Sequence, residues 1–176
     1  MALHPNDSPG FLLWHTTLRW QRGVTQALGP LGLTHVQFVL LACTWWLNEQ
    51  GERPTQVALA AQAGTDIKMT SQVVRTLERK GLIEREVDTT DTRARRLRMT
   101  RRGARLAPRA IAVVEEVDAR FFADVPATEA LRFLRRLVQP PKADAGRRGS
   151  GPERRRGSAG AAGKPRARSS GWPAEA

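Results

Sequence analysis

The chain has little of the chemistry that metal sites and disulfide frameworks need. Its 176 residues include one cysteine, Cys43, three histidines and no tyrosine. A single cysteine excludes an intramolecular disulfide framework and a cysteine-based zinc site. Because the histidines are scattered and form no ligand cluster, we expect no bound metal and no cofactor.

Long apolar runs are also missing. No stretch of about 18 apolar residues is present, so we expect no membrane-spanning segment. Residues 1–10 lack the basic start, apolar middle and cleavage site of a signal peptide, and we expect a cytoplasmic protein. The sequence contains no phosphate-cradling glycine loop, no nucleophile elbow and no carboxylate pair with a plausible base. These absences favour a binding protein over an enzyme.

Positive charge, in contrast, is in excess. The formal net charge is +12, which attracts polyanions, nucleic acid first and an anionic membrane second. An arginine-rich genome would produce the same excess. Half of it lies in residues 140–176, where nine Lys or Arg residues stand against three acidic ones. That segment has one large apolar side chain, Trp172. We expect it to be a disordered basic tail, because it cannot bury enough surface to offset its ordering entropy.

Apolar residues recur at helical spacing before the tail. The pattern predicts six helices. Three cover residues 10–28, 55–63 and 66–80, and three others begin at residue 34, at residue 100 and after residue 126. Gly29-Pro30 ends the first of them. Thr34 and Gln37 have the spacing of a capping box. Thr65 and Asp66 are both candidates for the cap of the fourth helix.

Two short segments alternate apolar and charged residues around a polar loop. They cover residues 82–87 and 95–99, and this pattern is typical of a β-hairpin. Helix, helix and then hairpin is the order of a winged helix-turn-helix, whose second helix enters the major groove. We therefore expect a mainly α fold with a small β-hairpin wing.

The helix over residues 66–80 has side chains suited to reading DNA. We expect four apolar residues to face the core: Met69, Val73, Val74 and Leu77. The polar residues then project outward: Lys68, Ser71, Gln72, Arg75 and Arg79. Glutamine can bridge N6 and N7 of adenine, and arginine can bridge O6 and N7 of guanine. An ordinary amphipathic helix with a solvated polar face would show the same pattern.

The hairpin is rich in arginine. Its loop and second strand contain Arg93, Arg95, Arg96 and Arg98, and residues 66–105 hold twelve Lys or Arg against six acidic residues. Arginine gains from the negative potential of a narrow minor groove. Asp88 and Asp91 can brace these arginines, since a carboxylate pair fixes the direction of a guanidinium. The alternative is that both are ordinary turn-forming aspartates.

Residues 88–103 read D-T-T-D-T-R-A-R-R-L-R-M-T-R-R-G. This segment resembles the wing signature of the MarR family, D-x-x-D-x-R, a basic strand and then L/M-T-x-x-G. The upstream M-T-S-Q-V-V-R-T-L-E-R-K-G-L-I-E-R is similar to the recognition helix and first wing strand of that family. P-G-F-L-L-W and G-L-T-H-V-Q-F-V-L-L resemble its first two helices, so the resemblance spans about residues 9–138.

The resemblance implies roles for particular residues. Arg93 would enter the minor groove, with Asp91 bracing it, and residues 68–75, Thr70 included, would read bases. N- and C-terminal helices would interleave with those of a second copy, giving a homodimer on a near-palindromic operator. The implied division is 1–33 and 101–139 for dimerisation, 34–100 for DNA binding with recognition helix 66–80 and wing 82–100, and 140–176 for the tail.

Many MarR proteins release DNA when a small aromatic or anionic effector enters the crevice beside the dimer helices. Candidates for such a pocket here are Trp14, His15, Leu18, Trp45 and Trp46. Tryptophans at helical spacing are, however, more often part of a core or of a dimer interface. Cys43 lies on the apolar face of its helix, where burial should raise the pKa of the thiol, so we do not expect it to sense peroxide.

The sequence as a whole predicts a transcriptional regulator that binds double-stranded DNA and is released by a small molecule. We interpret it as a repressor. The alternative is a non-specific architectural protein that coats DNA with its basic tail. A third interpretation, an adaptor that has lost DNA binding, conflicts with the basic wing.

Overall fold

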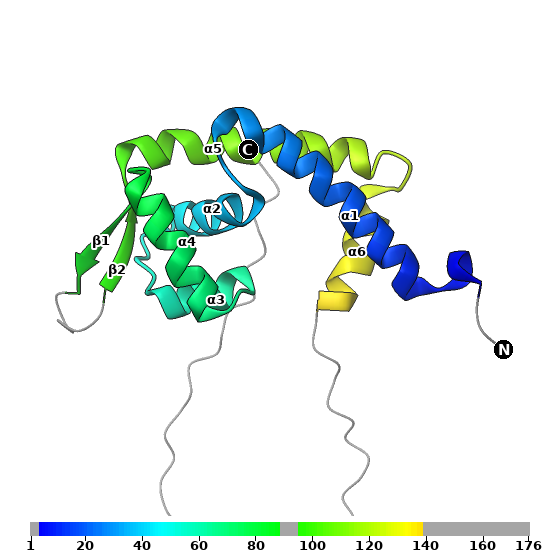
Figure 1. Ribbon diagram of the computed structural model, residues 1–176, viewed down its shortest axis with the longest axis horizontal. Helices are drawn as coiled ribbons and strands as arrows, with labels where there is room; N and C mark the ends of the chain where they lie inside the picture. Colours follow the sequence, from blue (N-terminus) through cyan, green and yellow to red (C-terminus); the bar gives the residue numbers. More distant parts are fainter. Residues whose placement is uncertain (1–3, 89–94, 139–176) are drawn as a thin grey trace, which may run out of the picture. The chain divides into compact units, whose positions relative to one another are not determined.

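The computed structural model describes residues 4–88 and 95–138 of the chain (Figure 1). In order, its elements are η1 (Pro5–Asp7), α1 (Pro9–Leu28), η2 (Gly29–Leu31), α2 (His35–Glu49), α3 (Gln56–Ala63), α4 (Ile67–Arg79), β1 (Ile83–Val87), β2 (Arg95–Met99), α5 (Arg101–Phe121) and α6 (Ala127–Val138). The predicted fold class, mainly α with one antiparallel hairpin, is confirmed.

Side-chain caps set the starts of the helices, as the sequence predicts. The Thr34 hydroxyl accepts a hydrogen bond from the Gln37 backbone N–H (3.3 Å), and the Gln37 amide oxygen accepts one from the Thr34 N–H (3.4 Å). This reciprocal pair is the predicted capping box at α2. Asp66, of the two candidates, caps α4, because its carboxylate accepts the Met69 N–H at 2.8 Å. Gly81 follows α4 with a φ of +65°, a conformation that favours glycine.

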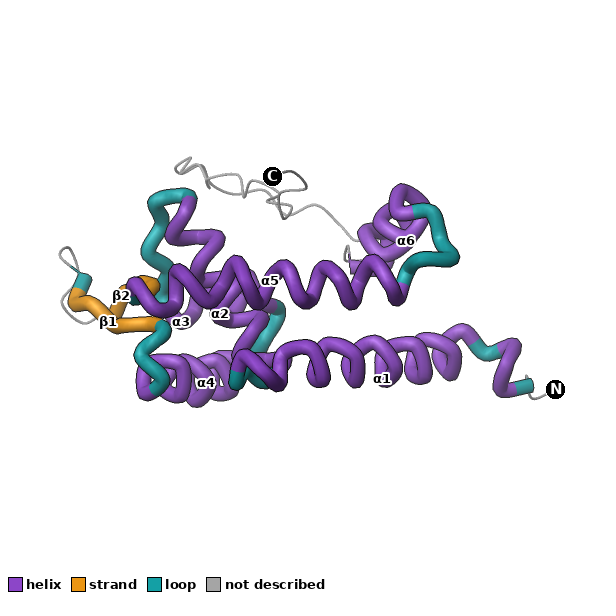
Figure 2. Tube along the Cα trace, turned by 90° about the horizontal axis from the view of Figure 1, so that it is seen from above, coloured by secondary structure: helices purple, strands orange, loops and turns teal. Residues whose placement is uncertain are grey.

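The core joins the helices to the hairpin. α2 packs against α1, α3, α4 and α5 and against β2. The largest fully buried side chains come from α1, α2, α3 and α4 and from the hairpin and the residue before it: Leu28, Leu40, Leu41, Leu59, Leu77, Leu82, Ile83 and Leu97. α5 also packs along α1 (Figure 2). A Cβ at Gly23 would lie 3.1 Å from Cγ1 of Val117, so glycine permits this close approach.

The hairpin is fixed in register by its pairing. Ile83 lies opposite Met99 and Val87 opposite Arg95, with Leu97 buried toward the core. The first turn of α5 then sits on the end of the strand. A Cβ at Gly103 would lie 2.0 Å from the backbone oxygen of Leu82, so only glycine fits there.

α6 and the first turns of α1 contribute nothing to this core. Every side chain of α6 from Leu131 to Val138 is exposed, and so are Phe11 to Trp14 of α1. Among the described residues, no single helix is long and apolar enough to cross a membrane. One pair meets that test jointly, residues 9–31 and 35–49, but it is bent by 73° and its second helix is α2, whose buried residues form part of the core.

Candidate nucleic-acid interface

α4 presents a polar face to solvent and an apolar face to the core. Val74 and Leu77 are fully buried. The exposed polar side chains on the opposite side are Lys68, Gln72, Arg75 and Arg79, and Ser71 is half-buried. The helix therefore exposes hydrogen-bonding groups of the kinds that read adenine and guanine edges.

Two expectations for the first turn of α4 are wrong. Thr70 is fully buried, and its hydroxyl donates to the Asp66 carbonyl oxygen at 2.8 Å and lies 2.7 Å from the Thr65 hydroxyl. Because its polar atom is engaged inside the fold, Thr70 cannot contact DNA. Met69, which the sequence placed in the core, is 37% exposed instead. Because Thr70 points inward at this turn, Met69, the residue before it on the helix, lies at the surface.

The far end of α4 is tied to the start of α2. The Lys80 ammonium donates to the backbone oxygen of Gly32 at 2.6 Å and to the side-chain oxygen of Gln37 at 2.7 Å. Gln37 therefore takes part in the capping box of α2 and also holds the end of α4. This link fixes α4 relative to the turn that follows α1.

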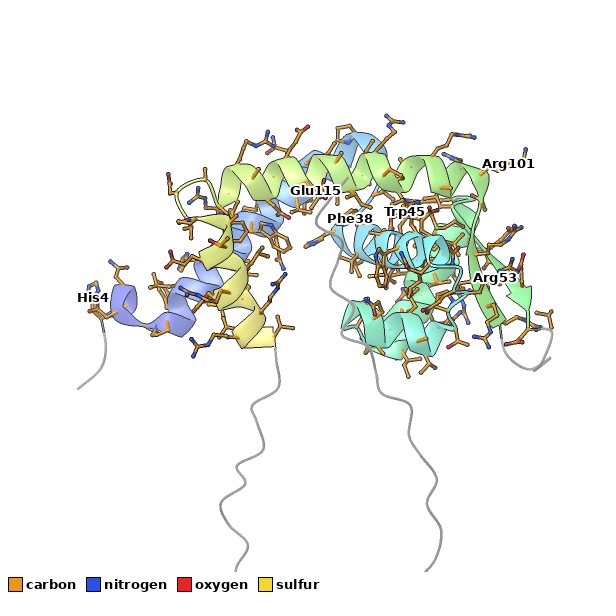
Figure 3. All side chains as sticks on the ribbon, turned by 180° about the vertical axis from the view of Figure 1, so that it is seen from behind. His4, Phe38, Trp45, Arg53, Arg101 and Glu115 are labelled. Atoms are coloured by element: carbon orange, nitrogen blue, oxygen red, sulfur yellow. The ribbon has the colours of Figure 1, made fainter. Side chains whose placement is uncertain are left out.

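Acidic residues of β1 lie opposite the arginines of β2. Glu84 faces Arg98 and Glu86 faces Arg96 in the register of the hairpin. The Arg98 guanidinium bridges both glutamates, with Nη2 2.5 Å from Glu84 and Nε 2.7 Å from Glu86. Arg53, from the loop before α3, adds a second cation to Glu86 at 2.7 Å (Figure 3). The sequence analysis missed these partners, although cross-strand pairing of alternating charges in the hairpin is a signal for them.

Asp88, the residue that follows β1, is held beside Arg96. Its side chain is 6% exposed and pairs with the Nε of Arg96, whose Nη1 donates to the Arg53 backbone oxygen at 3.2 Å. Arg95 is exposed. Asp91 and Arg93 lie outside the described residues. The wing arginines Arg96 and Arg98 are thus directed by carboxylates, while their role in DNA binding stays a prediction.

Comparison with known proteins places this arrangement in a family. Residues 33–94 match the MarR family model. The chain is 49% identical over 119 residues to YdcH of Bacillus subtilis (strain 168), an uncharacterized HTH-type transcriptional regulator, covering 68% of this chain and 81% of YdcH. The chain belongs to the MarR family. It is also 34% identical over 133 residues to the HTH-type transcriptional repressor Rv2887 of Mycobacterium tuberculosis, covering 75% of this chain and 93% of Rv2887.

Solved MarR structures share the fold. CouR from Rhodococcus jostii RHA1, bound to p-coumaroyl-CoA, has a TM-score of 0.69 and 30% identity, covering 77% of this chain and 93% of CouR. Rv2887 with salicylic acid has a TM-score of 0.56 and 33% identity, covering 74% of this chain and 93% of that one. The protein is therefore a transcriptional regulator of the MarR type.

The predicted ligand residues do not come together in this MarR protein. Trp14 and His15 are exposed on α1, and Leu18 is half-buried. Trp45 and Trp46 are partly buried on α2 and pack against the core. None of the five lines the hollow between α1 and α5 or the one beside Arg53 and Arg96.

A hollow of about 400 Å³ lies instead between α1 and α5. Its lining combines aromatic, cationic and small side chains: Arg19, Trp20, Gly23, Gln26, Ala27, Val117, Arg120 and Phe121. The Arg19 guanidinium lies 5.4 Å from the ring centre of Phe121. These lining residues were not expected from the sequence, although Arg19, Gly23 and Gln26 recur at helical spacing on one face of α1.

Three side chains join α1, α2 and α5 beside this hollow. The Trp20 indole N–H donates to the Asp118 carboxylate at 2.7 Å, and the His35 ring meets the Trp20 ring edge-on at 5.0 Å. Burial lowers the pKa of His35, and the Asp118 charge offsets part of that effect. On α2, burial raises the pKa of the Cys43 thiol to about 11, which leaves it protonated at neutral pH.

Proposed function

We propose that the protein is a repressor that binds a near-palindromic operator as a homodimer and leaves it when a small molecule binds. The observation that carries this proposal is the exposed face of α4, where Lys68, Gln72 and Arg75 project from a helix beside a basic hairpin. Gln72 and Arg75 would read base edges, and Lys68 would bind a base or a phosphate. The activity is binding to DNA in the cytoplasm, without catalysis.

The wing would contact the minor groove beside each recognition helix. Arg93 is the residue that the family resemblance assigns to this contact, with Asp91 bracing it. The pairing of Asp88 with Arg96 supports the same design, because a carboxylate fixes the direction of a guanidinium. Arg95 would add positive charge along the groove, and Arg98 would contact DNA in the direction that its pairs with Glu84 and Glu86 set.

A homodimer would cover the exposed apolar ends of the molecule. Those side chains lie at the start of α1 and along α6: Phe11, Leu12, Leu13, Trp14, Leu131, Phe133, Leu134, Leu137 and Val138. So many exposed apolar groups are unusual on a monomeric surface and are typical of an interface. Residues 1–33 and 101–139 would form the dimer and residues 34–100 would bind DNA, one half-site per protomer.

The hollow between α1 and α5 would bind the effector. Arg19 and Arg120 offer positive charge there, and Trp20 and Phe121 offer aromatic faces. The related proteins CouR and Rv2887 were solved with p-coumaroyl-CoA and salicylic acid, both of which are aromatic and carry acidic groups. We therefore assign an aromatic anion as the effector class, with salicylate as the first probe in an operator-release assay.

The alternative is an architectural protein that coats DNA without sequence preference. The net charge of +6 on residues 140–176 favours it, because attraction between an excess of cations and phosphate does not depend on base sequence. Specific binding should exceed non-specific binding by roughly 10³-fold or more, whereas a coating protein shows little preference.

Selection of genome fragments distinguishes the two. Purified protein, with and without residues 140–176, is mixed with genomic fragments at about 150 mM salt. Enrichment of a short inverted repeat by both forms supports an operator-specific dimer. Uniform recovery supports the architectural function. Arg93→Ala should bind the recovered operator much more weakly while remaining dimeric, and unchanged affinity would contradict the assignment of the wing.

A further inference from the structure

The first turn of α4 has its polarity reversed. Ile67 is 55% exposed and Met69 is 37% exposed, whereas Thr70 is fully buried. A surface helix normally turns apolar residues inward and polar residues outward. Departures from that pattern are expected at functional sites, where a local rule is broken to serve a partner.

Nothing in residues 4–88 and 95–138 accounts for the exposure of Ile67 and Met69. Neither Ile67 nor Met69 belongs to the hydrophobic core or to the partly buried side chains packed against it. They also lie on a different helix from the exposed apolar groups of α1 and α6. Burying such side chains is favourable, so a partner that covers them gains binding energy.

The charge around Ile67 and Met69 is positive and therefore complementary to that of DNA. Lys68 lies between the two residues in sequence, and Arg75 and Arg79 are exposed further along the same helix. The one acidic side chain at this end of α4, Asp66, is committed to the cap, where it accepts the Met69 N–H. A polyanion is therefore the occupant that fits, and it must offer apolar groups to the first turn.

Duplex DNA offers one apolar group on the base edges of its major groove, the 5-methyl group of thymine. In helix-turn-helix proteins the N-terminal residues of the recognition helix contact those edges. Ile67 and Met69 are the first and third residues of α4.

We infer that Ile67 and Met69 are specificity-determining residues that read thymine through its 5-methyl group. Each operator half-site then carries thymine opposite the first turn of α4. Gln72 and Arg75 select bases by hydrogen bonds one to two turns later. This inference rests on the proposed function, since it names the bases that the same interface reads.

Replacing thymine by uracil tests the inference, because uracil keeps the base pairing and its hydrogen-bonding edge but lacks the methyl group. The operator recovered by selection is synthesised with each half-site thymine changed to uracil, one symmetric pair at a time. Fluorescence anisotropy at fixed salt then gives the dissociation constant for the wild type, Ile67→Ala, Met69→Ala and Val57→Ala. Val57 is the matched control, since it is 59% exposed on the neighbouring helix α3.

At one or two symmetric positions, uracil should weaken wild-type binding about fourfold per methyl, or roughly fifteenfold for both half-sites. The ratio of the dissociation constants for the uracil and thymine operators should fall toward one in Ile67→Ala or Met69→Ala and stay unchanged in Val57→Ala. An operator bound equally well with uracil, a half-site without thymine, or a penalty unchanged in both α4 variants overturns the inference and leaves the proposed function intact. A failure to enrich any operator overturns both.

Discussion

Individual arginines of the wing are not simply free positive charges. Arg98 bridges Glu84 and Glu86, and Arg96 is held by the nearly buried Asp88. Exposed ion pairs of the Arg98 kind contribute about 0–1 kcal/mol to folding. Asp88 differs because its side chain is only 6% exposed. Its charge has lost most of its hydration, and the ion pair with Arg96 replaces that hydration. The main effect of the exposed pairs is on the direction of the guanidinium groups.

Removing Asp88 should therefore cost more than removing an exposed acid. Asp88→Ala should lower the free energy of unfolding by about 1–2 kcal/mol, since Arg96 is 40% exposed and can partly recover hydration. Glu116→Ala is the control, because the Glu116–Arg120 pair is 4.0 Å long and exposed on both sides. Urea unfolding at one fixed protein concentration measures both. Equal losses in the two variants would show that Asp88 does not stabilise the wing.

Cys43 should be inert to electrophiles in the native protein. A pKa of about 11 leaves about one thiol in ten thousand ionised at neutral pH. We expect iodoacetamide to label Cys43 far more slowly in the folded protein than in urea, and peroxide to leave operator binding unchanged. Mass spectrometry follows the labelling. Rapid native labelling would mean that the thiol is accessible and ionised, which would restore a redox role.

At the scale of elements, the contact between α1, α2 and α5 should depend on pH. The pKa of His35 is lowered in the fold, so the unfolded chain takes up the proton more readily. Stability from the neutral ring is therefore fully present above the unfolded pKa of about 6.5 and falls as the pH drops below it. Urea unfolding of the wild type should show lower stability at about pH 5.5 than at about pH 7.5.

His35→Gln isolates the contribution of that ring. The variant should lose some stability at both pH values, because the edge-on contact with Trp20 is removed. Its difference in stability between the two pH values should be smaller than that of the wild type. An identical difference would assign the pH dependence to other groups.

Element boundaries were largely predictable because they depend on neighbours in sequence. Thr34 with Gln37, Asp66 and Thr100 cap the helices whose starts the sequence gives, and Gly81 ends α4. These signals act over three or four residues, so no tertiary knowledge is needed. The order of helix, helix and hairpin followed from the same local patterns, and the family resemblance added roles for particular residues such as Arg93.

The details of the site were less predictable because they depend on contacts distant in sequence. Arg53 reaches Glu86 only through the packing of the loop before α3 against the hairpin. Thr70 is buried because the Thr65 hydroxyl and the Asp66 carbonyl oxygen are hydrogen-bond partners for its hydroxyl. A prediction from the spacing of apolar residues takes no account of such partners. Trp20 was overlooked in favour of Trp14 because periodicity alone does not say which part of α1 meets α5.

For the molecule as a whole, the proposed dimer should depend on α6. Phe133→Arg or Leu137→Arg places a charge among its exposed apolar side chains, and burying that charge in an interface is costly. Both variants should shift toward monomer in light scattering and bind the operator at least tenfold more weakly, because one half-site is bound at a time. Thr128→Arg adds the same charge at an exposed polar position of α6 and should remain dimeric. Dimers of unchanged stability in all three variants would place the interface elsewhere.

The two halves of the wing signature have different roles. The D-x-x-D-x-R half contains the residues proposed to contact DNA, whereas the T-x-x-G half, which ends at Gly103, packs the hairpin against α5. Thr100 caps α5 and donates to the Gly81 carbonyl oxygen at 2.7 Å, and Gly103 leaves room for the carbonyl of Leu82. A genetic screen for loss of regulation should therefore recover substitutions at Gly103 as readily as substitutions of arginines. Those alleles would be temperature-sensitive folding defects, because any side chain at Gly103 would collide with the backbone where the hairpin meets α5.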